Sequence, residues 1–193
     1  MKKIVFILLV LAATSCDKLL TQYPHNAKTV DKMTEADVEL LMTGAYNIAQ
    51  YKPTFNGYAL FDIIGGDLIR PGATSTNTPA LVIQGAIAPG QSIVSSPWNG
   101  YYAGLYQINN FIIAAEKLPD SPRKTELCGT GYFFRGLYYY YLVTRWRNVP
   151  IVTGPVDYDV PQTPEAEAWE FVAGEFRKAV EMAPDFTDKN YVS

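Results

Sequence analysis

Residues 131–150 read GYFFRGLYYYYLVTRWRNVP, and this stretch contains eight aromatic side chains. Four of them are the consecutive tyrosines at positions 138–141. Because consecutive residues of an α-helix point about 100° apart, four tyrosines in a row sweep about 300° around the helix axis. They do not form one flat platform for a ligand, and the run instead predicts a helix that is contacted on several sides. We expect four helices to be too few to surround it, so that a continuation of the chain or a partner also packs against it.

The composition is that of a globular protein. The chain has 193 residues, of which 48% are hydrophobic and 18% are charged, and this length corresponds to about one domain. Removal of residues 1–15 would leave 14 basic against 19 acidic residues, a net charge of −5. An acidic chain with scattered basic residues is a poor nucleic-acid binder, so no nucleic-acid partner is predicted.

The N-terminus has the pattern of a lipoprotein signal peptide. Lys2 and Lys3 precede the apolar residues 4–13, and small residues then lead to Cys16. This order is typical of a secretory signal that is cleaved before a cysteine. We expect residues 1–15 to be removed and Cys16 to become an acylated N-terminal residue that carries a lipid such as palmitate. The alternative is an ordinary signal peptide in which the cysteine is incidental.

The mature chain is predicted to be a tether followed by one helical domain. Residues 16–33 are polar and mixed, and they are expected to run from the lipid to a domain formed by residues 34–193. Lipidation of Cys16 would leave Cys128 as a single thiol, so no disulfide is predicted. Cys128 lies in an apolar helical stretch and is expected to be a small core residue.

Four helices are predicted from capping residues and from apolar side chains at helical spacing. The first runs from about Glu35 to Tyr51, with Thr34 and Asp37 as a capping box and Pro53 as a stop signal. Each of the other three begins with a hydroxyl residue as N-cap and a proline in the first turn. These pairs are Ser96 with Pro97, Ser121 with Pro122, and Thr163 with Pro164. The third helix is expected to end near Trp146.

The last predicted helix carries part of the tetratricopeptide pattern. Val172, Phe176, Ala179 and Pro184 follow the spacing of the second half of that repeat. The apolar stripe of this helix is predicted to comprise Trp169, Val172, Ala173, Phe176, Ala179, Val180 and Ala183. We therefore predict an all-α fold of tetratricopeptide-like helical hairpins, with a long irregular loop and a short extended segment from Val149. A generic helical hairpin is the alternative.

Residues 65–97 form the irregular loop, which is either a functional surface loop or a disordered segment. Planar polar side chains and a nearby aromatic residue make this region a candidate for ligand binding. The candidate ligand-binding residues are Phe61, Asp67, Arg70, Asn77 and Gln84. Trp98 lies on the apolar stripe at the start of the next helix, so it is expected to be a core residue and not a ligand platform.

The residue types needed for catalysis and metal binding are sparse. The single histidine, His25, lies in the predicted tether, which is a poor scaffold for a general base. Asp157 and Asp159 form a DxD sequence that is expected to be two solvated acids and not a calcium site. With Asp62 and Asp67 they are glycosidase candidates by composition only. We predict no enzymatic activity, no cofactor and no metal site.

The aromatic helix resembles a helix of the SusD/RagB family of outer-membrane nutrient-uptake lipoproteins. In that family a helix reading R-A-x-x-Y-x-x-L-x-x-x-[YF]-G-D-V-P leads into a short strand. The corresponding residues here are Arg135, Gly136, Tyr139, Leu142, Trp146, Arg147, Asn148, Val149 and Pro150. Gly136 replaces the usual alanine, and Arg147 with Asn148 replaces the usual Gly-Asp.

Further pieces resemble the family in the same order along the chain. The lipidated start is matched by Cys16, Leu19 and Pro24, and the first-helix L-x-x-G-A-Y by Leu41, Gly44, Ala45 and Tyr46. A W-x-x-x-Y-x-x-I-x-x-x-N region is matched by Trp98, Tyr106, Ile108 and Asn110, with Asn109 competing for the last place. The helix that begins P-x-x-E is matched by Pro164, Ala168, Trp169 and Ala179, with Glu175 where Asp is usual.

The resemblance covers nearly the whole chain and implies the N-terminal portion of a longer, SusD-like protein. It implies a lipid-anchored protein of the cell outer membrane that binds a glycan or other nutrient and delivers oligosaccharides to a TonB-dependent outer-membrane transporter (SusC-like). Its glycan site is expected to draw partly on the irregular loop and partly on residues beyond the end of this chain. The alternative is a helical-repeat scaffold that binds another protein and no sugar.

Overall fold

The computed structural model of the protein describes residues 28–50, 88, 90–154 and 159–183. The chain divides into two compact units, one up to Met33 and one from Thr34 onward. The described part of the first unit contains the 3-10 helix η1 (Val30–Lys32). The predicted signal peptide and most of the predicted tether lie outside the described residues. In the part of the chain that the structure describes, no helix is both long and apolar enough to cross a membrane.

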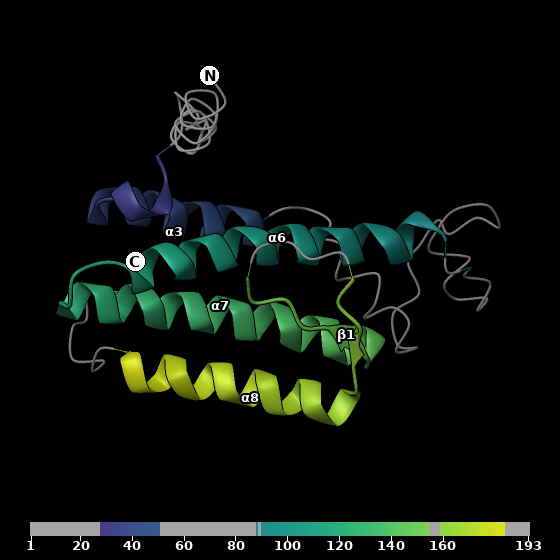
Figure 1. Cartoon of the computed structure of the whole chain (residues 1–193). Helices are drawn as coiled ribbons and strands as arrows, with labels where there is room; N and C mark the ends of the chain where they lie inside the picture. Colours follow the sequence, from purple (N-terminus) through teal and green to yellow (C-terminus); the bar gives the residue numbers. More distant parts are fainter. Residues whose placement is uncertain (1–27, 51–87, 89, 155–158, 184–193) are drawn as a thin grey trace, which may run out of the picture. The chain divides into compact units, whose positions relative to one another are not determined.

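The described part of the second unit consists of four α-helices and a short β-ladder. Its elements are α3 (Glu35–Ala49), α6 (Ser92–Glu116), α7 (Pro122–Trp146), β1 (Val149–Pro150), β2 (Gln162–Thr163) and α8 (Glu165–Met182). Helix α7 packs between α6 and α8, and α3 packs mainly on α6 (Figure 1). The two strands pair antiparallel, with Val149 opposite Thr163. The predicted all-α fold of helical hairpins is confirmed, and α7 ends at Trp146 as predicted.

Two of the predicted helix starts are confirmed by their hydrogen bonds. At α3, the backbone N–H of Thr34 donates to Oδ2 of Asp37 over 2.8 Å, and Thr34 Oγ1 accepts from the N–H of Asp37 over 3.4 Å. At α7, Oγ of Ser121 accepts from the N–H of Lys124 over 3.0 Å, and Pro122 lies in the first turn. In both helices a side chain satisfies a backbone donor that has no partner within the helix.

The prediction for the start of α6 is wrong. This helix begins at Ser92, with Gln91 as its N-cap and Pro97 inside the helix. The N–H and the hydroxyl of Ser95 both donate to the carbonyl oxygen of Gln91, over 3.1 and 3.3 Å. Pro97 lacks the N–H that would donate to the carbonyl four residues earlier. The helix nevertheless extends upstream of the proline, so the Ser96–Pro97 pair does not mark its beginning.

The N-cap predicted for the fourth helix is also wrong. Thr163 belongs to β2, where it pairs with Val149, and α8 begins at Glu165 after Pro164. The N–H of Glu165 donates instead to Oδ1 of Asn148 over 2.9 Å. Pairing in the β-ladder keeps Thr163 extended, and Asn148, from the turn between α7 and β1, caps the helix in its place. This cap depends on tertiary structure, and local sequence does not reveal it.

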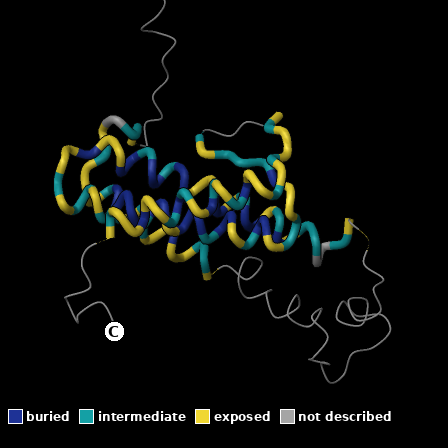
Figure 2. Tube along the Cα trace, turned by 90° about the horizontal axis from the view of Figure 1, so that it is seen from below, coloured by how far each residue is buried: buried dark blue, intermediate teal, exposed yellow. Residues whose placement is uncertain are grey.

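The tyrosine run of α7 is contacted on several sides, as predicted. Tyr138 and Tyr139 are fully buried. Tyr138 meets Tyr101 of α6 edge to face, with ring centroids 5.7 Å apart, and Tyr139 meets Phe171 of α8 in the same way at 5.2 Å. The buried positions follow the inner faces of the packed helices (Figure 2). The two central tyrosines therefore face opposite neighbours of α7.

Helices of this chain contact each ring of the run, and the expectation that a continuation of the chain or a partner also packs against it stays a prediction. Tyr141 stacks on Tyr101 of α6, and Tyr140 packs against Trp169 of α8 with ring centroids 5.7 Å apart. Among the four tyrosines, Tyr140 is the most open, at 40% exposed. Helices of this chain therefore contact all four rings, because α6 and α8 lie on opposite sides of α7.

Two glycines allow α6 and α7 to approach closely. A Cβ atom at Gly104 would lie 2.2 Å from Cε1 of Tyr138, and one at Gly131 would lie 2.5 Å from Cγ1 of Ile112. Both distances are far below a van der Waals contact, so any side chain at these positions would push the helices apart. The absence of a Cβ at these two positions makes room for the aromatic packing between α6 and α7.

A buried ion pair joins α7 to α8. Nε of Arg135 donates to Oε2 of Glu175 over 2.7 Å, and the two side chains are 7% and 1% exposed. The other carboxylate oxygen of Glu175 accepts from Nζ of Lys178 over 3.0 Å. Nη1 of Arg135 donates to Oδ1 of Asn109 in α6 over 3.3 Å. One guanidinium therefore connects the three helices α6, α7 and α8.

The predicted apolar stripe of α8 is only partly buried. Val172 and Ala179 lie in the core, whereas Ala173, Val180 and Ala183 are exposed, with Val180 at 76%. The main packing partner of α8 in the described structure is α7, so one narrow face of the helix is covered. The buried face also includes Glu175, which is charged and was therefore not part of the predicted apolar stripe.

Cys128 lies in the core of α7, as predicted. Burial, with a smaller effect of the nearby Glu116 carboxylate, raises the pKa of its thiol. A thiol that remains protonated is a poor nucleophile, so Cys128 is a packing residue.

We predict that Glu175→Ala lowers the free energy of unfolding by about 3 to 5 kcal/mol, because Arg135 then remains buried without its carboxylate. The double variant Arg135→Met/Glu175→Leu should be much more stable than Glu175→Ala, since it removes both buried charges. Chemical denaturation followed by circular dichroism measures these differences. The control is Glu39→Ala, which breaks the partly exposed 2.7 Å pair with Arg123 and should cost less than about 1 kcal/mol. A Glu175 variant as stable as this control would contradict the prediction.

Candidate ligand-binding site

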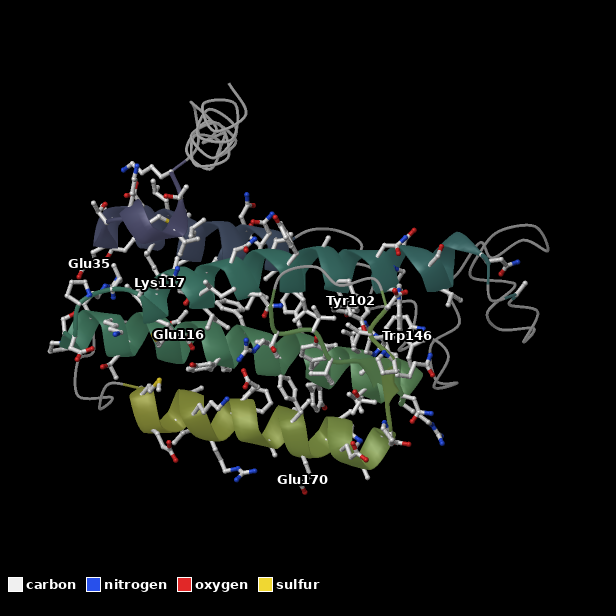
Figure 3. The ribbon with its side chains drawn as sticks, in the orientation of Figure 1. Glu35, Tyr102, Glu116, Lys117, Trp146 and Glu170 are labelled. Carbon is white, nitrogen blue, oxygen red and sulfur yellow. The ribbon has the colours of Figure 1, made fainter. Side chains whose placement is uncertain are left out.

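A cavity of about 390 Å³ lies between α6 and the segments around the β-ladder. Its size is in the range of small-molecule sites, and aromatic and amide side chains make up much of its wall. It is lined by Trp98, Asn99, Tyr102, Leu105, Tyr106, Asn109, Pro150, Val152, Gly154 and Val160. Figure 3 shows Tyr102 and Trp146 in the part of the structure where β1 lies.

The α6 side of the cavity is an aromatic stripe. Trp98, Tyr102 and Tyr106 are spaced four residues apart, so they follow one another along one face of the helix. The ring of Trp98 lies 4.8 Å from that of Tyr102 and 5.2 Å, edge to face, from that of Trp146. Trp98 was expected to be a core residue, but it is only half-buried and lines the cavity. Its packing on Trp146 orients the indole in the cavity wall.

The opposite side of the cavity is held to the helices by side chain to backbone hydrogen bonds. The hydroxyl of Tyr102 donates to the carbonyl oxygen of Pro150, and Nδ2 of Asn109 donates to that of Val152, each over 2.9 Å. Tyr139 of α7 donates its hydroxyl to the same Val152 carbonyl over 3.0 Å and accepts from the Val152 N–H over 2.7 Å. Three side chains from two helices therefore fix the backbone of residues 150–152.

Burial keeps these phenols in their neutral, donating form. Desolvation raises the pKa of Tyr139 to about 12, against an opposing hydrogen bond from the Val152 backbone. Desolvation, assisted by the nearby Tyr139, also raises the pKa of Tyr102 well above its ordinary value. Both hydroxyls are consequently protonated near neutral pH and can donate to the loop carbonyls.

The cavity wall is connected to the buried ion pair through Asn109. This side chain accepts from Arg135 through Oδ1 and donates to Val152 through Nδ2. The amide therefore has partners on both of its polar atoms, and its role is to hold the loop. Such a fully satisfied buried network is rigid.

Two polar residues of the wall remain available for a ligand. Tyr106 is 46% exposed, and within the described part of the chain neither its hydroxyl nor its ring has an assigned contact. The side chain of Asn99 is exposed and likewise makes no hydrogen bond to a described residue. Together with the indole of Trp98, they present apolar rings beside groups that donate and accept hydrogen bonds. This combination suits a polyhydroxylated ligand with apolar C–H faces.

The site residues predicted from the sequence lie outside the described residues. This is so for Cys16 and for the candidate ligand residues Phe61, Asp67, Arg70, Asn77 and Gln84. Asp159 is exposed, whereas Asp157 and His25 lie outside the described residues. Within the described ranges, no three His, Cys, Asp or Glu side chains are grouped so that they could hold a metal ion.

The cavity-lining residues are not recognisable as ligand contacts from the sequence. The sequence pattern predicts Trp98 to be a core residue, and Tyr106 enters only through the family resemblance. The four-residue spacing of aromatic side chains from position 98 to 106 was the available signal. That spacing is equally compatible with a core stripe, and only the position of the loop decides between the two.

Comparisons with known proteins agree with this architecture. A family model of SusD-like proteins, described as starch-binding and associating with the outer membrane, matches residues 19–183. SusD-like protein P2 of Formosa agariphila is 26% identical over 194 residues, which cover 95% of this chain and 38% of the relative. SusD-like protein P25 of the same organism is 24% identical over 79% of this chain and 31% of the relative. This chain therefore spans about a third of the length of these curated relatives.

Solved structures share the fold. A SusD homolog from Bacteroides thetaiotaomicron superposes with a TM-score of 0.70 at 20% identity, over 84% of this chain and 33% of that one. A laminarin-binding SusD-like protein gives a TM-score of 0.70 at 20% identity, over 81% of this chain and 36% of that one. A structure described as containing a xylogluco-oligosaccharide gives a TM-score of 0.65 at 20% identity, over 79% of this chain and 31% of that one. With a family model that matches residues 19–183, the chain belongs to the SusD-like family, whose members bind carbohydrate and associate with the outer membrane.

Proposed function

We propose that this protein captures an oligosaccharide or related nutrient at the outer membrane and delivers it to a TonB-dependent, SusC-like transporter. The observation that carries the proposal is the cavity beside α6, whose wall combines Trp98, Tyr106 and Asn99 in a chain of a carbohydrate-binding family. Capture requires shape and hydrogen bonding and no bond chemistry, and SusD-like proteins form a family of binding proteins.

The chemistry of the wall supports sugar recognition. A pyranose ring has an apolar face of C–H groups, which packs on an aromatic ring, and a rim of hydroxyls, which pair with amides and phenols. The loop residues Asp67, Arg70, Asn77 and Gln84, with Phe61, are proposed to extend the site. Two relatives are described with laminarin and with a xylogluco-oligosaccharide, which makes glucans the first class to test.

The anchor is proposed to be Cys16, at the end of an apolar segment preceded by two lysines. One acyl chain alone gives only marginal membrane binding, so stable anchoring requires a cysteine that carries a diacyl group together with an N-acyl chain. The tether of residues 16–33 would then hold the helical domain at the membrane surface.

A protein-binding scaffold is the second candidate function. It is favoured by exposed apolar side chains on α7 and α8, of which Val180 at 76% and Phe133 at 46% are examples. Co-purification of a barrel partner, without retention by any polysaccharide, would support this candidate over the first.

We predict that Tyr106→Ala weakens oligosaccharide binding about tenfold or more, because it removes the most exposed ring of the wall. The measurement is affinity electrophoresis of the full chain in gels containing laminarin, xyloglucan or starch. Tyr46→Ala is the matched control, since Tyr46 is a comparably exposed tyrosine, at 51%, on α3 and does not line the cavity. If the parent chain is not retarded by any glycan, the proposed function is wrong. Equal retardation of both variants would place the binding site elsewhere.

Tyr139→Phe should loosen the loop wall without changing the ring packing. Loss of both hydrogen bonds to Val152 is expected to cost about 1 to 3 kcal/mol at neutral pH. The folded-state pKa of about 12 exceeds the ordinary tyrosine pKa of 10.0, so this phenol stabilises the fold below pH 10 and the contribution is lost between pH 10 and 12. Between pH 10 and 12, the free energy of unfolding should fall more steeply with pH for the parent protein than for Tyr139→Phe. Denaturation curves recorded at several pH values in this interval measure both slopes. Identical slopes would show that Tyr139 does not titrate as described.

Cys16→Ser should release the protein from the outer membrane, because the acyl acceptor is removed. Membrane fractionation measures the change, and mass spectrometry of the N-terminal peptide of the parent should show the mass of the acyl chains. A parent protein with an unmodified Cys16, recovered in the soluble fraction, would rule out the anchor.

A further inference from the structure

We infer that Asn148 is a positioning residue for the cavity, because its side chain joins the two chain segments that form the wall opposite α6. This inference rests on the proposed function. The first wall segment comprises residues 149–154, which follow Asn148, and the second comprises residues 159–163, which precede α8. The residues of these two segments that line the cavity are Pro150, Val152, Gly154 and Val160.

The two wall segments are joined at their base by one side chain and by the β-ladder. Oδ1 of Asn148 accepts a hydrogen bond from the backbone N–H of Glu165 over 2.9 Å. The ladder beside this contact has only two residues in each strand. A pair of strands this short is marginally stable by itself, so the Asn148 contact carries a substantial part of the connection between the segments.

The ladder relates the position of the second wall segment to that of the first. The first segment is fixed to α6 and α7 through the carbonyl oxygens of Pro150 and Val152. Pro150 pairs in the ladder with Gln162, which lies two residues after Val160. A loosened base would therefore let Val160 move relative to α6, and the shape of the cavity would change.

The turn that brings Asn148 to the start of α8 has a strained backbone. Arg147 has a φ of 61° and a ψ of −76°, close to the rare γ-turn that is unfavourable for residues with a side chain. Its N–H still donates to the carbonyl oxygen of Val143 over 2.9 Å, and the chain enters β1 at Val149. Strain of this kind persists where surrounding contacts hold it. The hydrogen bond of Asn148, the next residue, is such a contact.

The side chain of Asn148 is exposed, which separates its positioning role from packing of the core. Substitution by alanine removes the hydrogen bond to Glu165 without leaving a cavity between the helices. The contacts that hold α8 on α7, among them the 2.7 Å pair between Arg135 and Glu175, are unaffected. The loss is therefore expected in the geometry of the wall and not in the assembly of the helices.

The test compares two variants that each lose one hydrogen bond at a helix start. Asn148→Ala removes the bond at α8, and Ser121→Ala removes the 3.0 Å bond to the N–H of Lys124 at α7. Ser121 does not line the cavity, so it is the matched control. Titration calorimetry of the full chain with laminarin and xyloglucan oligosaccharides should show Kd about threefold to tenfold higher for Asn148→Ala and changed less than about twofold for Ser121→Ala. Both melting temperatures should fall by a similar few degrees.

The conservative variant Asn148→Asp should restore the affinity of the parent chain. A carboxylate accepts a hydrogen bond from the same N–H, and its negative charge suits the N-terminus of a helix. Its Kd is therefore expected within about twofold of the parent value. An affinity as low as that of Asn148→Ala would show that this hydrogen bond does not position the wall.

Hydrogen exchange without ligand tests the positioning role separately from glycan binding. Peptides that cover residues 149–152 and 160–164 should exchange about threefold to tenfold faster in Asn148→Ala than in the parent chain, because the base of the wall opens more often. The same peptides should exchange at the parent rate in Ser121→Ala. Unchanged exchange in Asn148→Ala would overturn the inference.

The binding results distinguish the inference from the proposed function. If the parent chain binds a glucan and Asn148→Ala binds it equally well, the inference is wrong and the proposed function stands. Equal weakening by Asn148→Ala and Ser121→Ala would also overturn the inference, since both bonds would then act through stability alone. A parent chain that binds no glycan would overturn the proposed function and the inference with it.

Discussion

The buried ion pair between Arg135 and Glu175 is the interaction on which the arrangement of α6, α7 and α8 depends. Two charges at 2.7 Å, almost without exposure, require each other, since either one alone would be left in a medium of low polarity. The pair therefore determines which face of α8 meets α7. The contact of Arg135 with Asn109 extends this constraint to α6.

The same network reaches the cavity. Asn109 accepts a hydrogen bond from the guanidinium of Arg135 and donates one to the carbonyl of Val152. Tyr139 bonds both the N–H and the carbonyl of Val152. The wall beside α6 is thus assembled from hydrogen bonds that originate in the core, and the exposed Asn99 and Tyr106 line the cavity. A site built in this way is organised before a ligand arrives, which reduces the entropy lost on binding.

Helices and their class could be predicted because they depend on local periodicity and capping. The Thr34 capping box and the Ser121 N-cap are made within four residues, so the sequence reveals them directly. The cap of α8 is made by Asn148, and its position depends on the β-ladder. The start of α6 was missed because proline after serine is compatible with a helix interior once an upstream turn exists.

Residue patterns alone predict that the chain is helical, that the tyrosine run lies inside a helical packing and that the protein resembles SusD-like lipoproteins. These conclusions rest on spacing along one chain and on residue types. The packed helices and loop are needed to show that Trp98 lines a cavity, that Glu175 is buried and that Asn109 supports a loop. Whether a side chain is buried in the core or lines a cavity depends on which other segment of the chain packs opposite it. The elements opposite these three residues come from more than 25 positions away in the chain.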